Sequence, residues 1–275
     1  LFPVGTTTVT YTATDESRNS SSCSFTVVVS DLEAPTFIDP LQDTVINCNT
    51  AIPSSSVTAN DPCNANPIAA VLVSDTTIAG SCAQAFAIVR TWEATDSNGN
   101  TNTLTQTISV QDTTAPSLIC MAPAVELDAN GMGQITTADV DNGSSDNCSA
   151  TLNFRLSQST FDCSDVGMLA ITLFAEDDCG NVDSCLVDVN VQDNINPVFT
   201  NCPTDVTFTL EPGACRLPYD FPLSGSDNCT DANDLLLTQL QGPTLGSDLE
   251  KETVTTFEFE LNDGNGNTAN CTWTV

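Results

Sequence analysis

The 275-residue sequence predicts an all-β protein: tandem immunoglobulin-like β-sandwich domains of about seven strands each, in an extended array. Three observations favour this fold class. A junction motif returns at a fixed interval, short β-branched and aromatic segments with alternating polarity lie between the junctions, and no stretch sustains a helical period.

The junction motif has the form Val-x-Asp-x-x-x-Pro. Its aspartates are Asp31, Asp112 and Asp193, at steps of 81 residues (31 to 112 and 112 to 193). Such an interval is long enough for each repeat to bury its own core, which indicates separate domains and not a solenoid. We therefore expect the C-terminal part of one repeat at 1–30 and nearly complete repeats at 31–111, 112–192 and 193–275. Because the pattern starts and stops within a repeat, we expect a segment of a longer protein.

The strongest strand patterns follow the chain in order. They are residues 8–13, 24–29, 86–92, 169–174 and 255–261. Runs rich in Asn, Asp, Gly, Ser and Pro separate them, as in a sandwich of short strands. Trp92 and Trp273 fall on positions expected to face inward, so core packing is favoured over a sugar-stacking surface.

Composition limits the classes of partner. The formal charge is −31, from 36 acidic and 5 basic residues. Nucleic acids and anionic membrane surfaces both attract basic proteins, so this balance excludes both as partners and leaves cations, proteins and sugars. Thirteen cysteines and no histidine indicate an oxidising compartment in which disulfides persist. Cys-x-x-Cys pairs typical of metal–thiolate sites are absent.

Comparing the repeats predicts two disulfides. The first-strand and last-strand cysteine positions are both filled in repeats 112–192 and 193–275, and both empty in repeat 31–111, which has Asp39 and Leu104 there. Two positions that carry cysteine in the same repeats, and lack it in the same repeat, are interpreted as the two ends of one disulfide. The predicted pairs are Cys120 with Cys185 and Cys202 with Cys271. Cys23 stands at the same last-strand position, and we expect its partner before residue 1.

The other cysteines are paired within repeats in this prediction. Elimination gives Cys215 with Cys229, and we further predict Cys148 with Cys163 and Cys48 with Cys82. Cys63 and Cys179 are then left over, so a different pairing, including one across a domain boundary, stays open. We expect all bonded cysteines to be structural and not redox-active.

Aspartates recur at three places in each repeat: the junction, an Asp-x-Cys loop and an Asp-x-x-Gly-Asn turn. An immunoglobulin-like sandwich brings these three places to one end. Three converging carboxylates repel one another unless a cation bridges them, and Ca²⁺ accepts six to eight oxygen ligands. The alternative is ordinary turn chemistry without an ion. The predicted calcium ligands are Asp31, Asp61 and Asp96; Asp112, Asp146 and Asp177; and Asp193, Asp227 and Asp263.

The sequence also resembles the hyalin repeat (HYR) family. The resemblance is carried by Phe2 to Asp15, Cys23 to Asp31, Ser145 to Cys148, Ser226 to Cys229 and Asn201 to Pro203. Repeats 31–111 and 112–192 are similar to variants in giant secreted surface proteins of Bacteroidetes-type bacteria. The resemblance implies an extracellular adhesin or filament. It also implies O-glycosylation at the Asp-Thr motifs of Thr44, Thr76 and Thr113, although such motifs arise by chance in a Thr-rich chain.

No arrangement of catalytic groups is present, so we predict that the chain is not an enzyme. Glu258 and Glu260 share a strand face, but a solvated face is the favoured interpretation. The predicted function is a stalk or filament segment of an extracellular cell-surface adhesin, held by disulfides and stiffened by calcium. The alternative is a module that binds a carbohydrate or protein with its end loops. Expected partners are other surface proteins, surface glycans or further copies in a fibre, with no insertion into the membrane.

Overall fold

The computed structural model describes all 275 residues, and apart from two 3₁₀ turns every regular element is a β-strand. The chain forms two compact units. The first comprises Leu1–Ala115, Asp146–Thr151 and Asp177–Asn181, and the second comprises Pro116–Ser145, Leu152–Glu176 and Val182–Val275. The compact unit that holds residues 31–111 thus includes two loops from the following repeat. The predicted all-β class is confirmed.

The first thirty residues form a hairpin. β1 (Gly5–Thr14) pairs antiparallel with β2 (Ser20–Val29) through ten residue pairs, from Gly5 opposite Val29 to Thr14 opposite Ser20. Tyr11 stacks on Phe25 with ring centroids 6.1 Å apart, and both rings are exposed.

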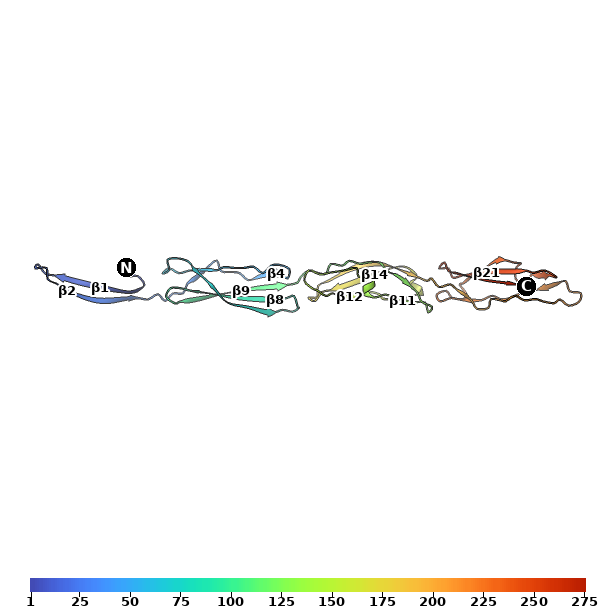
Figure 1. Ribbon diagram of the computed structural model, residues 1–275, viewed down its shortest axis with the longest axis horizontal. Helices are drawn as coiled ribbons and strands as arrows, with labels where there is room; N and C mark the ends of the chain where they lie inside the picture. The colour runs from blue at the N-terminus through green and yellow to red at the C-terminus, as the bar shows by residue number, and fades with distance from the viewer. The chain divides into compact units, whose positions relative to one another are not determined.

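Residues 31–111 form a sandwich of seven strands in two sheets. One sheet has the order β3-β5-β6 and the other β4-β9-β8-β7, in which β4 runs parallel to β9. Figure 1 labels β4, β8 and β9 of the second sheet. The strands are β3 (Thr36–Ile38), β4 (Thr44–Asn47), β5 (Thr58–Asn60), β6 (Ile68–Ala69), β7 (Val71–Ala79), β8 (Phe86–Thr95) and β9 (Thr101–Gln111).

The next repeat has six strands. A four-stranded sheet has the order β10-β15-β14-β12, with β10 parallel to β15, and β11 pairs with β13. The elements are β10 (Ala124–Glu126), β11 (Met132–Gln134), η1 (Thr137–Asp139), β12 (Asn153–Leu156), β13 (Thr160–Asp162), η2 (Cys163–Asp165), β14 (Gly167–Glu176) and β15 (Val182–Gln192).

The last repeat has seven strands in three small sheets, β16-β18, β17-β20 and β19-β21-β22. They are β16 (Val198–Phe199), β17 (Arg216–Pro218), β18 (Gly225–Ser226), β19 (Leu236–Gln241), β20 (Asp248–Glu250), β21 (Thr256–Asn262) and β22 (Thr268–Thr274).

Alternate residues of the long strands fill the cores. Because successive side chains of a strand point to opposite faces, each long strand contributes one buried row. The rows include Ile88, Trp92 and Ala94 on β8; Ile171, Leu173 and Ala175 on β14; Val187, Val189 and Val191 on β15; and Phe257, Phe259 and Leu261 on β21. Trp92 and Trp273 are buried, as their strand positions predict.

Two disulfides lie within repeats. The structure joins Cys120 to Cys185 and Cys202 to Cys271, which are the pairs inferred from comparing the repeats. Each ties a segment early in its repeat to the last strand.

The other predicted pairs are wrong, because the remaining disulfides connect successive repeats. Cys48 bonds Cys148, Cys82 bonds Cys179 and Cys163 bonds Cys229, so the pairs Cys48–Cys82, Cys148–Cys163 and Cys215–Cys229 are not formed. Cys179, expected to be left over, is bonded, whereas Cys23, Cys63 and Cys215 carry free, exposed thiols.

The geometry of the sandwich explains this correction. Cys48 follows β4, which ends beside the end of β9, and the N–H of Cys48 donates to the carbonyl of Gln111 at 3.0 Å. Cys82 lies in the β7–β8 loop at the same end of the sandwich. Both cysteines therefore lie where the next repeat begins, within reach of its Asp-x-Cys loop and its Asp-x-x-Gly-Asn turn.

Candidate metal centre

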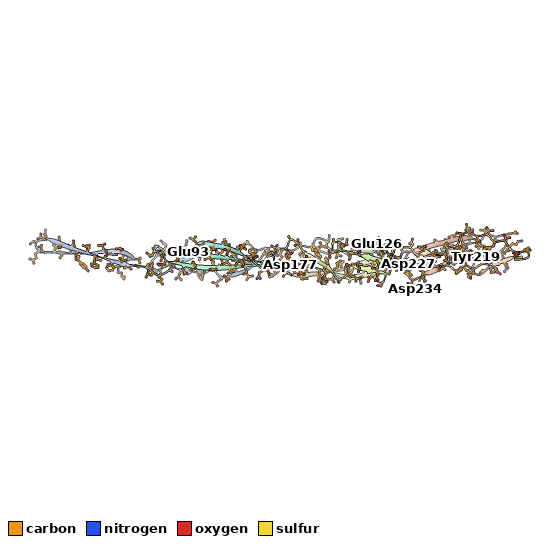
Figure 2. The ribbon with its side chains drawn as sticks, turned by 90° about the horizontal axis from the view of Figure 1, so that it is seen from below. Glu93, Glu126, Asp177, Tyr219, Asp227 and Asp234 are labelled. Atoms are coloured by element: carbon orange, nitrogen blue, oxygen red, sulfur yellow. A yellow bond between two sulfur atoms is a disulfide. The ribbon has the colours of Figure 1, made fainter.

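Three backbone segments bring Asp112, Asp146 and Asp177 together. Asp112 directly follows β9, and Asp146 opens the loop Asp146–Thr151. Asp177, which Figure 2 labels, opens the turn between β14 and β15. One carboxylate oxygen from each lies within 4.8 Å of the other two, so the predicted convergence is present.

No basic side chain neutralises this cluster. The ion pairs of the chain are Arg90–Asp75, Arg216–Asp248 and Lys251–Glu252. Asp112 and Asp177 are buried, and carboxylates held this close in a poorly solvated place repel one another.

The carboxylate of Asp177 holds the turn that follows it by accepting hydrogen bonds from the turn residues. Oδ1 of Asp177 accepts the N–H groups of Cys179 at 2.8 Å and Asn181 at 2.9 Å, and Oδ2 accepts Nδ2 of Asn181 at 2.7 Å. Gly180 has a φ of 87°, in the left-handed region that only glycine adopts without strain. These bonds fix the carboxylate at the start of the turn.

Asn181 links the turn to the junction. Its Nδ2 also donates to the main-chain oxygen of Asp112 at 3.3 Å. The equivalent residues Asn100 and Asn267 make the same contact with Asp31 and Asp193, at 3.3 and 3.0 Å. The last residue of the Asp-x-x-Gly-Asn motif therefore has a positioning role. Sequence reasoning used this asparagine only as a repeat marker.

The loop that begins at Asp146 also points one oxygen into the cluster. Oδ1 of Asp146 accepts the N–H groups of Cys148 at 2.8 Å and Ser149 at 2.7 Å. Oδ2 of Asp146 and Oδ2 of Asp112 are buried and have no hydrogen-bond partner. Two orphaned carboxylate oxygens, close to each other and to Asp177, are a donor set that fits a hard divalent cation.

The pKa values of Asp112 and Asp177 shift in opposite directions. Burial, followed by the negative charges of Asp146 and Asp177, raises the pKa of Asp112. Burial also raises the pKa of Asp177, but the hydrogen bonds from Asn181, Cys179 and Gly180 outweigh it and leave the pKa below its usual value. The charged form of Asp112 is thus disfavoured in the cluster when no counter-ion is present.

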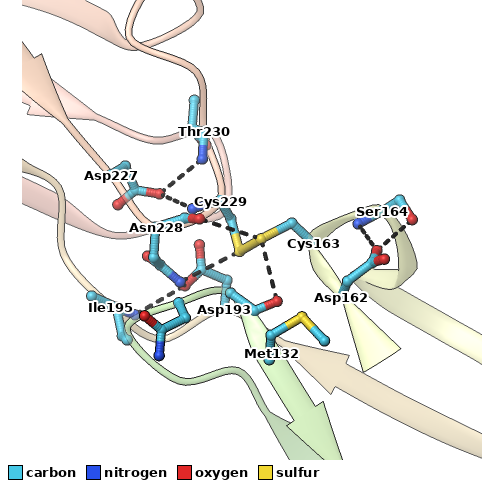
Figure 3. Close-up of a disulfide and its surroundings, with 12 residues drawn as sticks. Met132, Asp162, Cys163, Ser164, Asp193, Ile195, Asp227, Asn228, Cys229 and Thr230 are labelled. Atoms are coloured by element: carbon cyan, nitrogen blue, oxygen red, sulfur yellow. Dashed lines mark hydrogen bonds between the residues drawn. A yellow bond between two sulfur atoms is a disulfide. The ribbon is translucent and has the colours of Figure 1, made fainter. Parts of the chain in front are cut away.

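The last repeat carries a second cluster of the same kind. Oxygens of Asp193, Asp227 and Asp263 lie within 4.8 Å of one another. Oδ2 of Asp227 accepts the N–H groups of Cys229 at 2.9 Å and Thr230 at 3.0 Å, and its Oδ1 is buried without a partner (Figure 3). The Cys163–Cys229 disulfide lies beside it.

Repeat 31–111 is arranged differently. The structure groups Asp31 and Asp61 with Cys63, within 4.8 Å, and does not bring Asp96 into that group. Asp96 contacts the junction through asparagines instead. Asn98, which follows it in the turn, donates through Nδ2 to Oδ2 of Asp31 at 3.0 Å. Burial, followed by the charges of Asp31 and Asp61, raises the pKa of the Cys63 thiol.

Two further sets of candidate residues are the cysteines near Asp112 and the threonines predicted to be glycosylated. Cys48 and Cys148 lie near Asp112, but their sulfurs are joined in a disulfide and offer no thiolate. Thr44, Thr76 and Thr113 are all exposed, and their glycosylation stays a prediction.

Comparison with known proteins supports the hyalin resemblance. Residues 1–29 match the HYR domain family. The chain is 30% identical to hyalin of Lytechinus variegatus over 225 residues, 79% of this chain and 42% of that protein. It is also 30% identical to hyalin of Strongylocentrotus purpuratus over 238 residues, 80% of this chain and 19% of that protein. The chain thus spans less than half the length of these curated relatives.

Among solved structures, Drosophila N-cadherin EC1-4 is similar across 100% of this chain and 84% of its own, at 15% identity and a TM-score of 0.32. At that score the likeness supports no functional argument. No helix of the chain is both long and apolar enough to span a membrane. The resemblance to bacterial surface proteins stays a prediction.

Proposed function

We propose that this chain is a structural segment of an extracellular cell-surface adhesin, in which calcium and disulfides together fix the junctions between repeats at Asp112 and Asp193. Three-carboxylate clusters without a basic partner, each beside a disulfide between repeats, carry this proposal. The hyalin-like sequence and five disulfides support an extracellular location.

Calcium is the cation that these two clusters fit best. Their donors are carboxylate oxygens, and calcium accepts irregular oxygen shells in which water and main-chain carbonyls complete the coordination. Asp112, Asp146 and Asp177 would hold one ion, and Asp193, Asp227 and Asp263 another. The ion would supply the positive charge that the buried oxygens lack.

The mechanical consequence follows from where the ligands lie in the chain. Asp112 belongs to the linker, whereas Asp146 and Asp177 belong to two loops of the following repeat. An ion bound by all three would hold the linker against both loops, and so would restrict bending at the junction. Asn181 already makes a weaker, neutral version of this contact.

A second candidate function is protein binding by the last repeat. Leu236, Leu237 and Leu240 of β19 are exposed, on a strand at the edge of its sheet. An exposed apolar edge strand can accept a partner strand or an apolar surface. The partners would be surface proteins or further copies in a fibre.

The calcium proposal is tested by titrating the oxidised chain with CaCl₂ in a calorimeter and by thermal unfolding. Extracellular calcium modules bind at about 10⁻⁴ to 10⁻³ M, and calcium at about ten times Kd would stabilise the folded chain by roughly 1.4 kcal/mol per site. Asp112→Asn keeps the oxygen that accepts the Thr114 N–H but removes a ligand charge. We expect it to weaken one site at least about tenfold.

Asp178→Asn is the matched control, because Asp178 is the exposed neighbour of Asp177 and lies outside the cluster. It should leave binding unchanged. Equal binding by the wild type and Asp112→Asn, or no rise in unfolding temperature with calcium, would reduce the clusters to turn chemistry and overturn the proposal.

A further inference from the structure

Repeat 112–192 is covalently joined to its two neighbours at five places. The main chain enters at Asp112 and leaves at Asp193. Disulfides from the preceding repeat reach Cys148 and Cys179, and a disulfide to the following repeat leaves from Cys163 (Figure 3). Tension along the chain therefore has several covalent routes through this repeat.

The first route follows the main chain and the Cys120–Cys185 bond. It takes 112–120, crosses the disulfide and continues along 185–193, so it has 8 residue steps on each side of the bond. The main chain alone takes 81 steps between the same junction aspartates (112 to 193). Since an extended chain spans at most about 3.3 to 3.6 Å per residue, the bond reduces the longest possible extension of the repeat from about 280 Å to about 60 Å.

Two further routes of similar length avoid that bond. The segment between Cys148 and Cys163 is 15 steps long (148 to 163), and disulfides to neighbouring repeats hold both of its ends. The segment from Cys179 to Asp193 is 14 steps long (179 to 193) and starts at the bond to Cys82. Each segment reaches only about 50 Å when fully extended.

The folded repeat is already almost as long as these routes. β15, its longest strand, has 11 residues and spans about 36 Å at about 3.3 Å per residue. Complete unfolding could therefore lengthen the bridged repeat by only about 15 Å, whereas the same repeat without disulfides would lengthen by roughly 240 Å.

We propose that repeat 112–192 is an inextensible link, which carries tension through three covalent routes of matched length and gains almost no length when its sandwich unfolds. The route between Cys148 and Cys163 shares no residue with the other two, so loss of the Cys120–Cys185 bond alone leaves the link intact. This inference deepens the proposed structural role, but it rests on the disulfides and not on calcium binding.

The test is single-molecule force spectroscopy of the oxidised 275-residue chain, held by handles at Leu1 and Val275 after its free thiols are alkylated. The shortest covalent path between the ends takes 1–48, 148–163, 229–202 and 271–275, which is about 90 residue steps. Complete unfolding should end at a contour length of about 340 Å, and the reduced chain should reach about 950 Å. Measurement in EDTA should give the same values, which separates this inference from the calcium proposal.

The decisive variant combines Cys120→Ser with Cys185→Ser, because that bond is not on the shortest path. The contour length of the oxidised variant should equal that of the wild type. A gain of about 170 Å, expected if the remaining cysteines pair inside their own repeats, would overturn the inference.

The matched control combines Cys202→Ser with Cys271→Ser, which removes the equivalent bond of the last repeat. This bond is on the shortest path, so the control should lengthen by about 15 residue steps, or about 50 Å. A control that gains no length would mean that tension does not follow these disulfides, and would also overturn the inference.

Discussion

Individual aspartates of the clusters could be located from the sequence, but their contacts could not. Recurrence at three places per repeat indicated which carboxylates converge, because each place belongs to a loop at one end of a sandwich. Recurrence did not show that Asp96 stands apart while Cys63 joins Asp31 and Asp61. Distances of a few ångströms depend on side-chain directions in the loops, and spacing along the chain does not encode those directions.

Gly131 gives a prediction at the residue scale. Its φ is 72°, and a Cβ at this position would collide with Sγ of Cys163 and come within 3.0 Å of the Asn228 carbonyl oxygen. Gly131→Ala should lower the unfolding free energy by about 1 to 2 kcal/mol for the left-handed backbone and by more for the collision.

Gly143→Ala is its control, because Gly143 has a φ of 90° but no atom within 4 Å of the place that an added Cβ would occupy. Chemical denaturation of both variants isolates the contact with the disulfide. Equal losses in the two variants would contradict the close packing of Gly131 against Cys163.

Several of the long strands were predictable, although β7, β9 and β15 were not among the predicted patterns. The patterns at 86–92, 169–174 and 255–261 fall on β8, β14 and β21, because a buried row on a long strand produces visible alternation. Strands of two or three residues, such as β6, β16 and β18, contain too few residues to show any period. They form because a neighbouring strand supplies hydrogen bonds, which is a tertiary cause.

Two leucines in paired strands test the inward and outward faces. Leu173 on β14 is fully buried, whereas Leu186 on β15 is 73% exposed. Leu173→Ala should destabilise the chain by about 2 to 5 kcal/mol, since it leaves a cavity in the core. Leu186→Ala should change stability by less than about 0.5 kcal/mol. Urea unfolding measures both, and similar losses would contradict the assigned faces.

At the scale of the whole molecule, the covalent connections between repeats were not predicted. Repeat 31–111 has three cysteines and repeat 112–192 has five, and an odd number cannot be fully paired inside one repeat. The odd numbers made a disulfide between repeats possible but did not show which cysteines form it. The partners depend on which loops meet where one sandwich ends and the next begins, so only the assembled fold selects Cys48–Cys148, Cys82–Cys179 and Cys163–Cys229.

Peptide mapping checks this disulfide pattern. Digestion of the unreduced chain in acid, where disulfide exchange is slow, should release linked peptides for each of the three bonds between repeats. Mass spectrometry identifies them, and reduction should separate each pair. Peptides that link Cys48 to Cys82, or Cys148 to Cys163, would contradict the structure.

Each of these bonds also gives the molecule a second covalent path past the linker. Hydrolysis of one peptide bond between Asp112 and Pro116 would leave both fragments attached through Cys48–Cys148 and Cys82–Cys179. A protease alone would nick the chain there without separating the two fragments. Separation of the fragments would require a nick together with a reductant, so the integrity of this junction after cleavage depends on the disulfides and not on an intact linker.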